Sequence, residues 1–101
     1  MRRATGQSGN PPGQGPFMKI TLGVEGGLIR EATYATYPCP GCNACGKSAS
    51  ALAMGKSLEE AAAIDHPTLV ARVGPLPRHR QICYGLAVLA LADAITQLRQ
   101  Q

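Results

Sequence analysis

Hydrophobic and polar residues alternate over the stretch that begins at Phe17. Within residues 17–24 the apolar side chains recur with a period of two, which predicts a half-buried strand. Those apolar positions are Met18, Ile20, Leu22 and Val24. Residues 25–27 read Glu-Gly-Gly and predict a hairpin turn, because glycine tolerates the positive φ of tight turns. Residues 28–37 are rich in β-branched and aromatic side chains, so we expect a second strand that ends at Pro38.

The pattern after residue 43 is helical. A helix is expected from Asn43 or Ala44 to about Met54, with Gly55 as its C-terminal stop. Ser57-Leu-Glu-Glu is a capping box, and it predicts a short helix over residues 58–64.

Two further helices are expected in the C-terminal third. Asp65-His-Pro predicts a helix start with Pro67 at the first helical position, where its missing N–H costs nothing. Gly74 and the prolines after it end this helix. The last helix is expected from about Arg80 to Arg99, with apolar residues at roughly helical spacing. These residues are Ile82, Leu86, Leu89, Ile95 and Leu98.

The fold class that follows is α+β. Residues 1–16 contain Gly, Pro, Gln, Ser and Asn without a periodic apolar pattern, and we expect them to form a flexible tail. Residues 17–101 then form one domain, a small antiparallel β-sheet built as a hairpin and followed by several helices packed on one face. With three Tyr, one Phe and no Trp, much of the core must consist of small side chains.

Charge and hydropathy narrow the class of protein. The net charge of +4 is mild, and the basic residues are not interleaved with aromatic ones, so we expect no nucleic acid partner. A basic edge of this kind could dock an acidic protein. No hydrophobic segment follows the basic start, and the longest apolar run, residues 85–92, is shorter than the roughly 20 residues a membrane span needs. We expect a cytoplasmic protein without a membrane partner, and reduced thiols.

Cysteines carry the candidate chemistry. Cys39, Cys42 and Cys45 follow one another at a spacing of three, and Cys83 lies near the predicted start of the last helix. Thiolates are soft ligands for iron–sulfur clusters, zinc and Cu(I), and four of them fit a Cys₄ cluster or a Cys₄ zinc site. If the two long helices pack together, Cys39 and Cys83 meet at one end of the domain.

The roles of Cys42 and Cys45 depend on where the first helix begins. If it begins by about Asn43, the three thiols rotate away from one another; Cys42 then joins the site and Cys45 packs in the core as a small hydrophobe. If the chain stays irregular through Gly46, all three can bind one ion. His79 is either a supplementary ligand or a solvated loop residue.

An alternative function is thiol redox chemistry at Cys39-Pro-Gly-Cys42, although the βαβ setting of thioredoxin-like proteins is missing. The sequence contains no Ser/His/Asp set, phosphate-binding loop or pair of catalytic carboxylates. We therefore expect a protein that is not an enzyme.

The chain from Met18 onward resembles the IscU/NifU N-terminal family of iron–sulfur cluster assembly scaffolds. The resemblance is carried by MKI at 18–20, ATYPC at 35–39, GKSLEEA at 55–61, GPLP at 74–77 leading to Cys83, and the alanine-rich last helix. It implies a SufE/IscU-like α+β fold. It also implies that a cysteine desulfurase supplies sulfur, that iron or a [2Fe–2S] cluster binds to thiolates, and that acceptor proteins receive the cluster. Cys39 matches the sulfur-accepting second cysteine of the family, and Cys83 matches the third.

The chain also departs from the family pattern. The first family cysteine and the Asp two residues after it fall on Gln14 and Pro16, which replace neither a thiolate nor a carboxylate. Three readings follow: a shortened scaffold in which Cys42 or Cys45 replaces the lost ligand; a zinc- or iron-binding module that regulates a desulfurase; or a thiol-redox or sulfur-carrier protein. A homodimer could supply a Cys₄ site with two thiolates from each chain.

Overall fold

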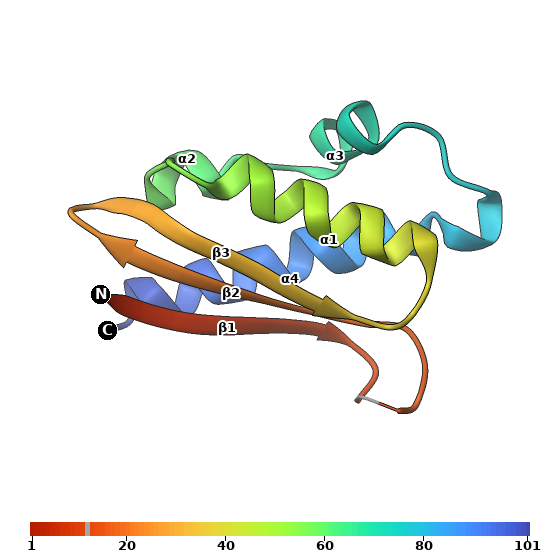
Figure 1. The fold of residues 1–101 in the computed structure, drawn as a ribbon, viewed down its shortest axis with the longest axis horizontal. Coiled ribbons are helices and arrows are strands. Elements are labelled where there is room, and N and C mark those ends of the chain that lie inside the picture. The colour runs from red at the N-terminus through yellow and green to blue at the C-terminus, as the bar shows by residue number, and fades with distance from the viewer. Residues whose placement is uncertain (12) are drawn as a thin grey trace.

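A computed structural model describes residues 1–11 and 13–101 of the chain; Pro12, part of the predicted tail, lies outside the described residues. The elements follow in the order β1 (Arg2–Gly9), β2 (Phe17–Glu25), β3 (Leu28–Thr36), α1 (Pro40–Ala53), α2 (Leu58–Ala62), α3 (His66–Val73), a 3₁₀ turn (Arg78–Arg80) and α4 (Ile82–Arg99). The α+β class is confirmed: an antiparallel sheet comes first and the helices pack on one of its faces (Figure 1).

The predicted hairpin is present as β2 and β3. These strands pair antiparallel from Met18 opposite Thr36 to Glu25 opposite Leu28. Gly26 and Gly27 form the turn with φ of 63° and 81°. Two consecutive positive φ values are what a type I′ turn requires, and this turn connects two strands with a twist that matches theirs.

The prediction of a flexible tail was wrong for Arg2–Gly9, which form β1. This strand pairs antiparallel along the whole of β2 and makes the sheet three-stranded, in the order β1-β2-β3. Its buried residues are small: Ala4 and Gly6 face inward while Thr5 and Gln7 are exposed. The strand has a period of two, but small side chains produce too weak a hydrophobic contrast for the pattern to be recognised.

Close contact between β1 and α4 explains why the inward positions are small. A Cβ atom added at Gly6 would overlap the backbone of Ala90 and Ala94. Gln97 of α4 donates from its side chain to the backbone oxygen of Thr5 at 2.8 Å, and the backbone N–H of Gln7 donates to Asp93 at 2.9 Å. The strand is thus held by the last helix as well as by the sheet.

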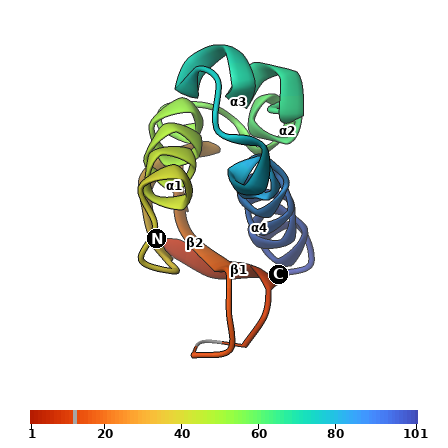
Figure 2. The ribbon, with the colours of Figure 1, turned by 90° about the vertical axis from the view of Figure 1, so that its right-hand side faces the viewer.

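The molecule has three layers. In the end-on view α1 and α4 lie side by side above the sheet, and α2 and α3 lie on top of them (Figure 2). The two chain ends lie close together at one end of the sheet (Figure 1). Cys39, which precedes α1, lies at the opposite end, where β3 finishes.

The predicted N-terminal caps of the two short helices are confirmed. Ser57 and Glu60 form the reciprocal capping box of α2, and Asp65 caps α3 by accepting from the backbone N–H of Thr68 at 3.0 Å. The carboxyl pKa values of Glu60 and Asp65 are lowered, because each accepts hydrogen bonds in its cap. Helix α2 ends at Ala62, two residues before the predicted end.

Helix α4 is the core helix. Its buried face consists largely of small and aliphatic residues that pack on the sheet. Ile82 and Leu89 belong to the apolar series that indicated this helix, but they are 59% and 61% exposed, because Ala87, Ala90 and Ala94 occupy buried positions. The helical stretch Arg78–Arg99 is long and apolar enough to cross a membrane by length and composition, but half of its apolar window is buried against the rest of the domain.

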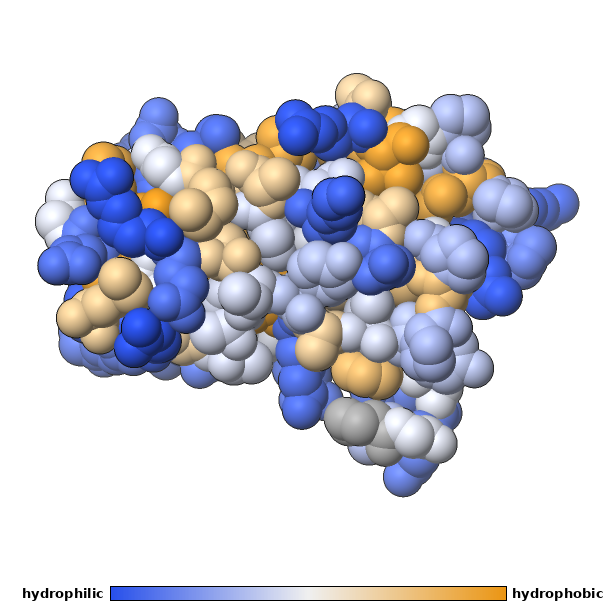
Figure 3. Space-filling model, viewed as in Figure 1, coloured by the Kyte–Doolittle hydropathy of each residue, from blue (hydrophilic) through white to orange (hydrophobic). Residues whose placement is uncertain are grey.

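Apolar surface is unevenly distributed on the face seen in Figure 3. Hydrophilic residues cover much of the left end, where β2 turns into β3, and apolar residues gather toward the upper right, around α3 and above the first part of α1 (Figure 3). The more apolar part of this face therefore lies toward the end of the molecule that carries Cys39.

A pair of glycine substitutions tests the contact between β1 and α4. We expect Gly6→Ala to lower the free energy of unfolding by about 1–3 kcal/mol, because the added methyl group overlaps the backbone of α4. Gly85→Ala is the matched control: a Cβ there meets nothing within 4 Å, and the change should raise helix stability by about 0.5–1 kcal/mol. Chemical denaturation measures both values, and a neutral Gly6→Ala would contradict the tight packing.

Candidate functional site

The end of β3 positions Cys39. The hydroxyl of Thr36 donates to the backbone oxygen of Phe17 at 2.7 Å, and the backbone N–H of Tyr37 donates to the same oxygen at 3.2 Å. These bonds hold the end of β3 against the start of β2. The chain then turns upward through Pro38, so Cys39 becomes the N-cap residue of α1 in an extended conformation.

Helix α1 begins at Pro40, three or four residues earlier than predicted. Proline suits the first helical turn, because it lacks only an N–H that would have no helical partner there. The backbone N–H of Asn43 already bonds to the carbonyl of Cys39 at 2.9 Å. Cys42 therefore lies on the first turn, three residues from Cys39 and on the same side of the helix. Pro40 was the sequence signal that could have revealed this start.

Cys83 reaches the same place from the other long helix. The proline-containing link turns through Arg78–Arg80, and α4 begins at Ile82, so Cys83 lies on its first turn. The hydroxyl of Tyr84 donates to the carbonyl of Gly74 and ties this turn to the end of α3. Gly41 lies against Leu76 and Arg80, so the link can pack closely on α1.

Three of the four cysteines come together. The Sγ atoms of Cys39, Cys42 and Cys83 all lie within 4.8 Å of one another, an arrangement that could hold a metal ion. Their side chains are nearly inaccessible, at 5%, 1% and 1% exposure. Four thiolates around zinc at about 2.3 Å would have sulfurs roughly 3.8 Å apart, so these three cysteines, which we call the cysteine triad, lie close enough together to supply three ligands of a tetrahedral site when all three are thiolates.

Cys42 and Cys83 are paired as a disulfide, while Cys39 and Cys45 are free. The Cα atoms of the pair are 4.9 Å apart, within the range of natural disulfides. The expectation of reduced thiols was thus wrong for this pair. The Cys39–Cys42 pairing considered for a redox protein is also not the one found.

Cys45 occupies a different environment. It is fully buried, and among the described residues it does not join the triad. Burial, with a smaller contribution from nearby Cys39, raises the pKa of its thiol to about 11. Such a thiol stays protonated near neutral pH, so Cys45 behaves as a core residue, as expected for an early helix start.

Two surface pockets flank the triad. One of about 440 Å³ is lined by Cys39 and its neighbours in the turn from β3 to α1. The other, of about 370 Å³, lies between the first residues of α1 and the 3₁₀ turn, and His79 and Arg80 line it. The first pocket gives a small molecule a route to Cys39, and the second places basic side chains beside that route. His79 lies in this second pocket and outside the triad.

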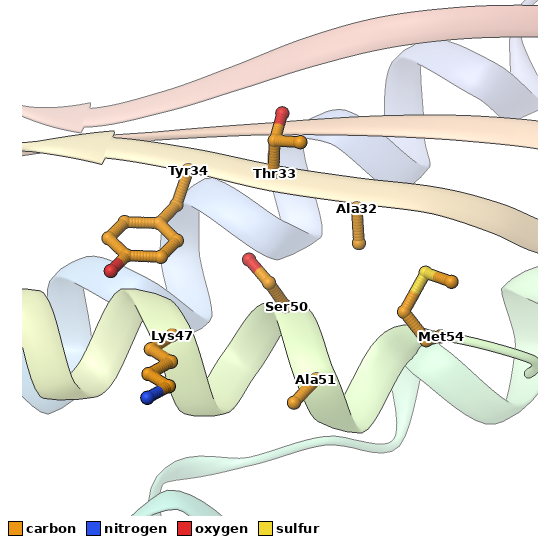
Figure 4. A pocket seen from close by; sticks show the side chains of 7 residues that line it. All are labelled: Ala32, Thr33, Tyr34, Lys47, Ser50, Ala51 and Met54. Carbon is orange, nitrogen blue, oxygen red and sulfur yellow. The ribbon is translucent and has the colours of Figure 1, made fainter.

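A third pocket lies farther along α1, between that helix and β3. Ala32 and Tyr34 project from the strand toward Ser50 of the helix and Met54 just after its end, around a space of about 380 Å³ (Figure 4). Its lining is mainly apolar and contains no thiol or carboxylate, so we assign it no metal chemistry. The buried Ser50 hydroxyl has no hydrogen-bond partner among the described residues.

Fold and site together define a class: a small α+β domain with a cluster of thiols where its sheet meets its two long helices. Comparison with known families identifies that class. Residues 1–101 match the NifU-like N terminal domain family, and the chain belongs to it. The resemblance seen in the motifs is confirmed.

The curated relatives carry a consistent description. The chain is 33% identical over 90 residues to iron-sulfur cluster assembly scaffold proteins IscU 1 and IscU 2 of Archaeoglobus fulgidus, covering 89% of this chain and 58% of each relative. It is also 33% identical over 91 residues to the iron-sulfur cluster assembly scaffold protein IscU of Buchnera aphidicola, covering 89% of this chain and 71% of that protein. The chain thus spans less than two thirds of the length of the archaeal relatives.

The raised pKa of Cys45 predicts a pH dependence of stability. The unfolded chain releases this proton near pH 9, whereas the folded chain holds it to about pH 11, so the folded state binds more protons in between. The free energy of unfolding should therefore fall as pH rises from about 9 to 11. We expect wild type to lose about 2 kcal/mol more than Cys45→Ala over this interval, measured by urea denaturation. Parallel curves for the two proteins would contradict the burial of this thiol.

Proposed function

We propose that this protein is an iron–sulfur cluster assembly scaffold that builds a [2Fe–2S] cluster on Cys39, Cys42 and Cys83 and passes it to acceptor proteins. The observation that carries the proposal is the cysteine triad, three sulfurs from two helices within 4.8 Å of one another. Membership in the NifU-like family and the similarity to IscU scaffold proteins support the same function. In this role the chain is a template and not a turnover enzyme.

The donor set suits iron and sulfide as a substrate. Thiolates are the usual ligands of [2Fe–2S] clusters, and a buried site protects a cluster from water. Cys42 takes the place of the ligand that is missing at Gln14 and Pro16. Cys45 remains in the core and outside the ligand set.

Three ligands leave one coordination position for a further thiolate. An acceptor protein or a second copy of this chain can supply it, and an open position of this kind allows a cluster to be handed on. A homodimer with shared ligands is one such arrangement.

Sulfur would reach the site from a cysteine desulfurase. Cys39 is the proposed acceptor of that sulfur, because it lines the 440 Å³ pocket while Cys42 and Cys83 are each 1% exposed. His79 and Arg80 beside the site give an acidic segment of a partner a place to bind. The cytoplasmic location expected from the sequence stays a prediction.

The three-thiol count also favours a second candidate, a module that binds one zinc or iron ion and regulates a desulfurase. Zinc bound by three protein ligands keeps a fourth position open for an exchangeable ligand. Such a protein would stay colourless and would release zinc when its thiols are blocked.

Anaerobic reconstitution distinguishes the two candidates. Reduced protein is incubated with a cysteine desulfurase, cysteine and ferrous iron, and visible absorption is recorded. We expect cluster bands in wild type, a fall to near background in Cys39→Ala, Cys42→Ala and Cys83→Ala, and wild-type bands in the matched control Cys45→Ala.

Transfer is measured next, by adding an apo-ferredoxin and following loss of the bands from this chain. A colourless wild type that retains tight zinc would overturn the assembly role. Cluster loss in Cys45→Ala but not in Cys42→Ala would overturn the proposed ligand set.

A further inference from the structure

The disulfide and the proposed ligand set use the same sulfur atoms. Cys42 and Cys83 cannot bind a metal as thiolates while they are bonded to each other. The third member, Cys39, is a free thiol within 4.8 Å of both. One end of the domain therefore holds a free thiol against a pair of cysteines that can exist as dithiol or disulfide.

We propose that the Cys42–Cys83 dithiol is a built-in two-electron reductant, which converts a persulfide carried on Cys39 into free sulfide and becomes the disulfide seen in the structure. This inference rests on the proposed function, in that it takes Cys39 as the residue that receives sulfur. It adds an activity, the reduction of sulfane sulfur by the scaffold's own thiols.

The reaction has two displacement steps. In the first, the Cys42 thiolate attacks the outer sulfur of the Cys39 persulfide; a bond forms from Cys42 to that sulfur, and Cys39 leaves as a thiolate. In the second, the Cys83 thiolate attacks the inner sulfur of the new Cys42 persulfide; the Cys42–Cys83 bond forms, and hydrosulfide leaves.

Atoms and electrons balance over the two steps. One persulfide and two thiols become one thiol, one disulfide and one molecule of hydrogen sulfide. The sulfane sulfur gains the two electrons that the two thiols lose. A dithiol reductant then restores the pair, so each cycle delivers one sulfide and consumes one external dithiol.

Accessibility favours this order of events. Cys39 lines the 440 Å³ pocket and, at 5% exposure, is the least enclosed member of the triad, so a persulfide donor that enters the pocket meets it first. Cys42 and Cys83 are each 1% exposed and are not among the residues that line this pocket. Sulfur thus enters through Cys39, and the pair meets it only after Cys39 has been loaded.

The position of the pair also distinguishes it from a purely structural disulfide. A free thiol beside a structural disulfide does not stabilise it, because the neighbouring thiolate can attack the disulfide and exchange with one of its sulfurs. Here the free thiol lies within 4.8 Å. Cys45, the remaining free thiol, lies outside the group and supplies a matched control.

The experiment uses reduced, metal-free protein under anaerobic conditions, with one equivalent of glutathione persulfide as the donor and no iron. Sulfide is measured with methylene blue, and free thiols are counted by alkylation and intact mass. We expect wild type and Cys45→Ser to release about one sulfide per chain and to lose two thiols, mapped by peptide digestion to Cys42 and Cys83.

The variants of the pair give the opposite result. Cys83→Ser and Cys42→Ser should retain one extra sulfur atom on the protein and release sulfide at least about tenfold more slowly. Release at the wild-type rate from both variants would overturn the inference. A disulfide that forms in wild type without release of sulfide would also overturn it. A disulfide that maps to Cys39 would do the same. Because the wild-type mapping needs no substitution, the test holds even if a variant fails to fold.

The assay separates this inference from the proposed function. Clusters that form from iron and inorganic sulfide, together with a persulfide that stays unreduced in the iron-free assay, would sink the reductant role and leave the scaffold standing. Sulfide release without any cluster formation would support the reductant role and contradict the scaffold function.

Discussion

The site depends on one packing contact, that between the first turn of α1 and the first turn of α4. It places the Cα atoms of Cys42 and Cys83 4.9 Å apart, although they are separated by 41 residues in the sequence. At this contact Gly41 lies against Leu76 and Arg80 of the proline-containing link, close enough that a Cβ at residue 41 would be in van der Waals contact with both. The sheet contributes indirectly, by holding α1 and α4 side by side on one face (Figure 2). Without this contact the chain has four cysteines but no site.

Local chemistry made much of the fold predictable. The turn at Gly26 and Gly27, the capping box at Ser57 and the cap at Asp65 each depend on a few neighbouring residues, and each is present. β1 was missed because its inward residues had to be small to fit against α4, and that requirement lies about 85 residues away in the sequence, at Ala90.

The candidate site was predictable only in part. The meeting of Cys39 with Cys83 follows once two helices are expected to pack, and the exclusion of Cys45 follows from an early helix start. The pairing of Cys42 with Cys83 could not be predicted, because it depends on the rotation of α1 about its axis, which changes by about 100° for each residue by which the helix start shifts. Pro40 fixes that start, and with it the direction in which Cys42 points.

The long sequence separation within the pair links the oxidation state of the site to the entropy of the chain. A bond between Cys42 and Cys83 closes a loop that contains α2, α3 and most of α1, and closing a loop of this length restricts the unfolded chain by about 4 kcal/mol. A metal centre held by the same two cysteines closes the same loop. The chain is therefore cross-linked both in the disulfide state and in the metal-bound state. In the reduced, metal-free state neither cross-link is present, so the first turns of α1 and α4 separate most easily there.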